Sequence, residues 1–82
     1  MPLFTISYDL NKPGQNYQPL YDELARIGAK RVLLSDWIVR TESTVITLRD
    51  HFRQFIDSND RLLVVQVETW ASWKAMVDIN SV

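Results

Sequence analysis

The chain contains no cysteine, which excludes disulfide bonds, thiolate catalysis and cysteine-ligated metal sites. It has one histidine in 82 residues, so a zinc site built from several imidazoles within one protomer is disfavoured. Mg²⁺, a hard cation that carboxylates and water bind, is the metal that this composition favours. Only two glycines are present and 46% of the residues are hydrophobic, which is typical of a folded globule and not of a low-complexity segment.

Long apolar runs and strong charge are also missing. The longest apolar stretch, Leu62 to Val67, contains Gln66 and is far shorter than a bilayer span. The N-terminal residues lack the basic and apolar segments of a secretory signal. A net charge of -1 disfavours a protein that coats nucleic acid by bulk electrostatics, although a local basic stripe remains compatible with it. We therefore expect a soluble, cytoplasmic protein with no membrane partner.

The spacing of apolar residues predicts a single domain, residues 1–82, with the order strand, helix, strand, strand, helix, strand. These elements are expected at residues 4–9, 17–27, 30–34, 37–40, 45–56 and 61–68. Asn16 is the expected N-cap of the first helix and Gly28 its C-terminal cap, while residues 41–44 provide capping side chains for the second helix. The two middle strands either form a hairpin at Ser35-Asp36 or are one bulged strand. The last strand is apolar enough to be central in a sheet.

This order predicts a ferredoxin-like α+β sandwich (βαββαβ), in which an antiparallel four-stranded sheet carries both helices on one face. Residues 69–82 form a C-terminal element without a clean period. Either Thr69 begins a short helix, or the segment adds an edge strand. The chain has three Trp and three Tyr residues, more aromatic surface than one small core must absorb. The C-terminal element therefore either lies at a homodimer interface or covers its own sheet.

Asp9 ends the first apolar strand and is the first candidate for a metal ligand, because a side chain at a strand end is held by the sheet and still reaches solvent. Aspartate is also a common strand-ending residue. Asp36 is the best second ligand, or else a plain turn residue. His51 is either a general base or a solvated helix residue. Candidate phosphate contacts are the basic residues Lys12, Arg26, Lys30, Arg31, Arg49 and Arg53.

Several short segments of the chain resemble a known superfamily. They are Tyr8-Asp9, Ile27-Gly28, Arg31-Val32 with Ser35, the helix from Val45 to Ile56, and Asp60-Arg61-Leu62-Leu63-Val64. Together they resemble the small nuclease-like subunit of the CRISPR adaptation complex, the VapD interferases and the SinR-family proteins. The segment from Tyr8 to Gln15 is most similar to the last of these.

The resemblance implies a ferredoxin-like homodimer in which Asp9 of each protomer faces its mate across a cleft. In the family's nucleases this pair of carboxylates binds a divalent metal for phosphodiester hydrolysis, which implies Mg²⁺ as the cofactor and Asp9 as the catalytic residue. Ser35 matches a serine that helps to shape the same cleft. The resulting expectation is a nucleic-acid-associated homodimer whose candidate activity is that of a metal-dependent endoribonuclease. RNA and DNA are both open as the nucleic acid that it binds. The slightly acidic charge and the aromatic C-terminal element support an alternative, a noncatalytic interaction or regulatory module that binds a protein partner or its own copy.

Overall fold

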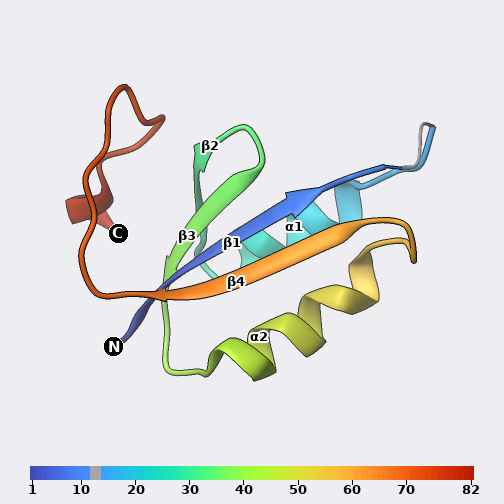
Figure 1. The fold of residues 1–82 in the computed structure, drawn as a ribbon, viewed down its shortest axis with the longest axis horizontal. Coiled ribbons are helices and arrows are strands. Elements are labelled where there is room, and N and C mark those ends of the chain that lie inside the picture. The colour runs from blue at the N-terminus through green and yellow to red at the C-terminus, as the bar shows by residue number, and fades with distance from the viewer. Residues whose placement is uncertain (12–13) are drawn as a thin grey trace.

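The structure is a computed structural model that describes residues 1–11 and 14–82. Its main elements are β1 (Leu3–Asp9), α1 (Gln18–Arg26), β2 (Lys30–Leu33), β3 (Asp36–Arg40), α2 (Val45–Phe52) and β4 (Arg61–Val67). Two short 3₁₀ helices, η1 (Arg53–Phe55) and η2 (Ile79–Ser81), follow α2 and end the chain. The strands form one antiparallel sheet in the order β2-β3-β1-β4 (Figure 1). This arrangement confirms the predicted ferredoxin-like α+β fold.

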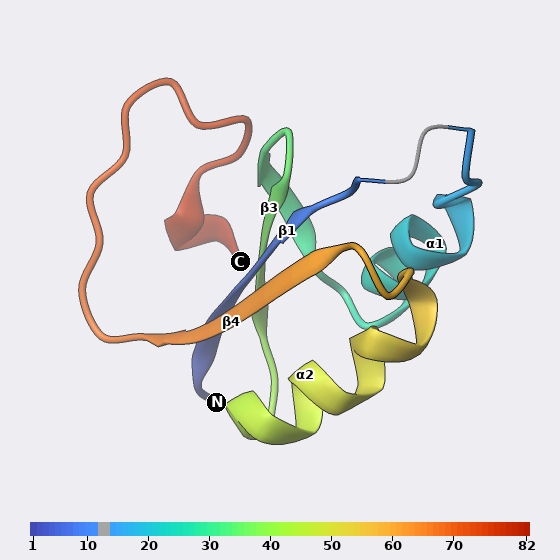
Figure 2. The same ribbon diagram turned by 45° about the vertical axis from the view of Figure 1, so that its right-hand side comes forward.

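β1 lies inside the sheet and determines what each face carries, because successive side chains of a strand point to opposite sides. Phe4, Ile6 and Tyr8 are buried against the two helices, on what we call the helix face. The alternate residues of β1 point to the other side of the sheet, which we call the open face. Figure 2 shows both helices on one side of the sheet and the C-terminal segment on the other.

The first helix is one residue shorter at each end than predicted. Tyr17, not Asn16, occupies the N-cap, and the Asn16 side chain instead accepts a hydrogen bond from the Gln18 N–H at 3.0 Å. Pro19 is accommodated because it lies in the first turn, where its missing N–H has no helical partner. Gly28 has a φ of +87°, which confirms its predicted role as the left-handed residue that ends the helix.

The second helix begins as predicted and ends early. The Thr44 side chain accepts a hydrogen bond from the Thr47 N–H at 3.1 Å and so caps the helix. The α-helix stops at Phe52 instead of Ile56, and the chain continues through η1. The apolar period persists through this change, since Phe55 packs on the same core as Phe52. The helix therefore changes from α to 3₁₀ while its row of core-facing apolar side chains continues.

The middle strands form a hairpin, not one bulged strand. Leu34 and Ser35 make the turn, and Asp36 is the first residue of β3 and not a turn residue. The register shifts between Arg31 and Leu33, so a bulge lies within the hairpin.

Two predictions about the last part of the chain are wrong. β4 lies at the sheet edge and not in its centre, because it pairs only with β1. Its apolar residues Leu63 and Val65 are consequently 59% and 42% exposed. Residues 69–78 form neither a helix nor an edge strand.

The C-terminal segment instead crosses part of the open face. Ile79 is buried there against Leu3, Val32 and Ile38, which form a second small core. The Met76 N–H donates a hydrogen bond to the Val32 carbonyl at 2.9 Å, which ties the segment to β2. In the part of the chain that the structure describes, no helix has the length and apolar character needed to cross a membrane.

The position of a residue in the core predicts how much its substitution lowers the free energy of unfolding. Phe52 is fully buried between α2 and the sheet. Phe52→Ala should lower the free energy of unfolding by about 3–5 kcal/mol, because it removes a buried ring and leaves a cavity. Ile46→Ala, on the same helix but 59% exposed, should change it by about 0.5 kcal/mol or less. Urea unfolding measures both, and equal effects would contradict this placement of the core.

Candidate functional site

Asp9 lies on the open face where β1 ends. Its side chain is 65% exposed, and it stands directly opposite Arg61, the first residue of β4, in the antiparallel register. The closest approach of the two charged groups is 3.7 Å, from Arg61 Nη1 to Asp9 Oδ2. An exposed pair at this distance holds its partners weakly. The carboxylate is therefore fixed by its strand and remains accessible to a ligand.

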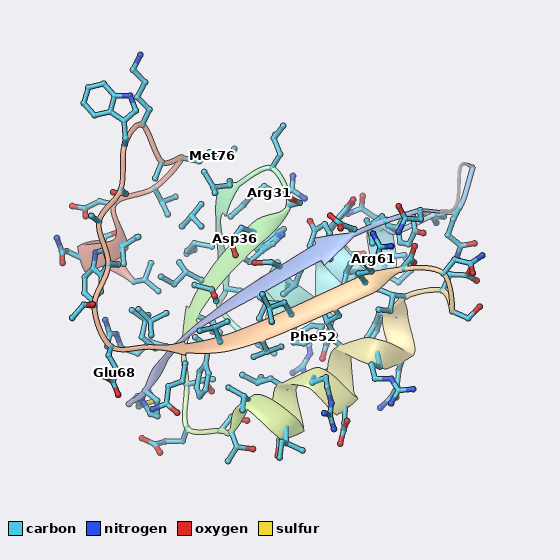
Figure 3. All side chains as sticks on the ribbon, in the orientation of Figure 1. Arg31, Asp36, Phe52, Arg61, Glu68 and Met76 are labelled. Carbon is cyan, nitrogen blue, oxygen red and sulfur yellow. The ribbon has the colours of Figure 1, made fainter. Side chains whose placement is uncertain are left out.

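A pocket of about 310 Å³ surrounds this strand end. Its lining residues include Asp9 and Ser35, which the sequence analysis singled out, together with Ser7, Arg61 and Leu63. The Tyr8 N–H donates to the Ser35 carbonyl at 3.1 Å, which holds the β2–β3 turn beside β1. Figure 3 shows Arg61 at this end of the sheet. Two of the candidate residues thus share one pocket.

Asp36 belongs to a neighbouring position on the open face. The Ser7 hydroxyl donates to Asp36 Oδ1 at 2.7 Å, and the carboxylate is half-buried. Asp36 does not line the Asp9 pocket; it lines a cavity beneath the C-terminal segment. Over residues 1–11 and 14–82 no group of three or more His, Cys, Asp or Glu side chains could hold a metal ion.

The candidate basic residues do not gather around Asp9. Lys12 lies outside the described residues. Arg31 is on the helix face, where its guanidinium lies 4.8 Å from the ring centroids of both Tyr21 and Trp37. It also donates to the Tyr8 hydroxyl at 3.4 Å. Cation–π contacts of this kind stabilise packing, so Arg31 is already engaged within the fold.

Arg49 and Arg53 share a different pocket, of about 260 Å³, between the end of α2 and the start of β4. Asp57 and Asp60 also line it, so the local field is mixed. Arg49 pairs with the neighbouring Asp50 at 2.9 Å. The two arginines are available to a phosphate at the periphery but lie apart from Asp9. Arg26 and Lys30 are exposed, and Arg26 is paired with Glu23.

His51 connects the two helices. Its Nε2 lies 2.5 Å from Glu23 Oε2, and Arg26 donates two further hydrogen bonds of 2.6 Å to the same carboxylate. The Glu23 side chain is only 12% exposed. These hydrogen bonds, first from Arg26 and then from His51, lower the pKa of Glu23 to about 2. His51 therefore acts within the helix layer, on the other side of the sheet from Asp9.

Arg61 is the site residue that the sequence analysis did not single out. The signal for it is topological: in a ferredoxin-like sheet β4 runs antiparallel to β1, so the residue that begins β4 faces the residue that ends β1. Comparison with known proteins does not assign the chain to a family. No protein-family model matches the chain, and no solved structure matches it at a significant level.

The Glu23 cluster predicts the acid behaviour of the fold. The pKa of Glu23 falls from 4.5 to about 2 on folding, so ionised Glu23 stabilises the protein above about pH 4.5, and this contribution disappears as the pH falls towards 2. Glu23→Gln should therefore lose less stability in acid than the wild type, as measured by urea unfolding across this range. Asp22→Asn, an exposed change on the same helix, is the control. Parallel curves for Glu23→Gln and wild type would contradict these hydrogen bonds.

Proposed function

We propose that the protein is a cytoplasmic homodimer that binds nucleic acid and hydrolyses phosphodiester bonds with Mg²⁺, using Asp9 from both copies. The observation that carries this proposal is the exposed Asp9 carboxylate, fixed at the end of an internal strand on the open face. Ser7 and Ser35 add hydroxyl groups to the same pocket. The resemblance to nuclease-like ferredoxin folds, drawn from the Tyr8-Asp9 segment, points to the same chemistry.

The exposed part of the open face supports self-association. Leu63 lines the Asp9 pocket, and Val65 follows it on the same side of β4. Exposed apolar residues beside polar ones are typical of interaction surfaces. In a two-fold dimer each copy uses the same patch, so pairing around Leu63 brings the two Asp9 side chains towards each other.

The donor set of the Asp9 pocket fits a hard cation. Its side-chain ligands are a carboxylate and hydroxyls, with no histidine or cysteine. Mg²⁺ keeps several waters and binds through one or two carboxylates, which matches one Asp9 from each copy. When bound, it would supply Lewis acidity that lowers the pKa of an attached water.

Residues of the chain itself would bind and orient the substrate. Asp9 holds the charge of the site, and Ser35 orients the substrate by hydrogen bonding. Arg61 exchanges its weak contact with Asp9 for a substrate phosphate. Arg49 and Arg53 add outer contacts to an RNA or DNA backbone, in the way that arginine contacts position nucleic acid without reading its sequence.

Cleavage of labelled single-stranded RNA tests the proposal. The wild type should cut it with Mg²⁺ or Mn²⁺ and not with EDTA. Asp9→Asn should slow cleavage by at least about 100-fold, because it removes the charge that holds the metal. Asp22→Asn, equally conservative and exposed on α1, should cleave at the wild-type rate. Equal cleavage by Asp9→Asn and wild type would identify a contaminating nuclease and reject the role of Asp9.

A second candidate is a noncatalytic interaction module. The observation that favours it is the amount of exposed apolar surface on one side of the molecule, where Trp70 and Trp73, 43% and 84% exposed, add to the β4 residues. Self-association without Mg²⁺-dependent cleavage would favour this module over the nuclease.

Both candidates predict self-association through β4. Leu63→Glu should weaken the dimer by at least about 30-fold, since burying a charge in an apolar contact costs about 2 kcal/mol or more. Ala25→Glu places the same charge on exposed α1, across the sheet, and should leave the dimer intact. Sedimentation equilibrium measures both. A wild-type monomer, or a dimer that Leu63→Glu does not weaken, would exclude this interface.

A further inference from the structure

A third cavity, of about 320 Å³, lies between the C-terminal segment and the open face. Val32 and Ile38 of the sheet line one side, and Trp70 and Ile79 of the segment line the other. Most of the lining is apolar. The volume lies at the lower end of the range of about 300–1,000 Å³ found for small-molecule sites.

Among the residues that the structure describes, Asp36 is the only charged one that lines this cavity. The Ser7 hydroxyl donates to its Oδ1 at 2.7 Å and fixes the carboxylate. Asp36 makes no ion pair, and its Oδ2 accepts no hydrogen bond, within residues 1–11 and 14–82. A half-buried carboxylate in apolar surroundings is unfavourable unless a cation pairs with it. Figure 3 shows Asp36 at the start of β3.

We infer that this cavity binds a small organic ammonium ion with an aromatic or aliphatic body. The ammonium group pairs with Asp36 Oδ2, and the body packs between Ile38 and Trp70. A tryptophan ring also attracts a cation through its electron-rich face. Lys74 already lies 5.6 Å over the Trp73 ring, which leaves Trp70 as the indole for the ligand. One carboxylate in an apolar lining suits this ligand better than a metal ion, which needs several oxygen donors.

The proposed site is separate from the Asp9 pocket and independent of nuclease activity. Ser7 lines the Asp9 pocket and its hydroxyl donates to Asp36, so one residue touches both places. Their surroundings differ: Asp9 is exposed and faces Arg61, whereas Asp36 is half-buried and faces apolar side chains.

Three probes of matching size and different charge test the inference: phenethylammonium, phenethyl alcohol and hydrocinnamate. Titration of the full chain, followed by NMR of backbone amides, should shift residues around Asp36 and Trp70. Phenethylammonium should bind at least about tenfold more tightly than the alcohol, and hydrocinnamate more weakly than both. Equal affinities for ammonium and alcohol, shifts elsewhere in the fold, or no binding of the ammonium up to about 10 mM would overturn the inference.

Variants distinguish the contribution of the Asp36 charge to ligand affinity from that of the apolar lining. Asp36→Asn keeps an acceptor for Ser7 and should reduce ammonium affinity about tenfold, to that of the alcohol, without changing the alcohol's own affinity. Unchanged alcohol binding also reports that the cavity is intact. Trp70→Leu should weaken the ammonium and the alcohol, whereas Asp22→Asn should change neither. Retained preference for the ammonium in Asp36→Asn would reject the assigned pairing.

Discussion

A two-sided sheet with helices on only one side is the constraint on which the rest of this structure depends. β1 makes it specific, because Phe4, Ile6 and Tyr8 point to the helix face, whereas Leu3 lies in the small core beneath the C-terminal segment. The opposite side of the same strand carries Ser7 and Asp9, and burying these polar groups in an apolar core would cost free energy. The candidate site residues of β1 are therefore on the open face because the helix face is filled by apolar side chains.

On the helix side several charged groups are paired within the fold, although the buried Nε of Arg31 has no hydrogen-bond partner among the described residues. Glu23 joins the two helices through His51 and Arg26, and Arg31 stacks on aromatic rings at the β2 edge. Three residues that look available for catalysis or phosphate binding in the sequence, Arg26, Arg31 and His51, are therefore engaged in contacts within the fold. The open face is covered only in part. The C-terminal segment packs on residues of β2 and β3 and leaves Leu63 and Val65 of β4 exposed. The proposed chemistry and the proposed association surface both use that exposed part.

Two aspartates on the same face have opposite surroundings, which is why we assign them different ligands. Asp9 is exposed to water in a pocket that two serines also line, which suits a hydrated divalent ion that displaces the weakly held Arg61. Asp36 has apolar side chains and an indole near it, conditions that suit an organic cation. Ser7 links the two places, because it lines the Asp9 pocket and its hydroxyl donates to Asp36.

The sequence by itself determined the order of elements, the alternation of β1, the helix end at Gly28 and the position of Asp9 at a strand end. Each of these depends on periodicity or backbone preference within one short segment, which a sequence pattern records directly. Tertiary structure decided that β4 lies at the edge, that Arg61 faces Asp9, that Arg31 is stacked, and that Asp36 faces the C-terminal segment. These features depend on contacts between residues far apart in the chain. A local pattern does not record which strand pairs with which, nor where an irregular segment packs, because the free energy of burial belongs to both partners of the contact.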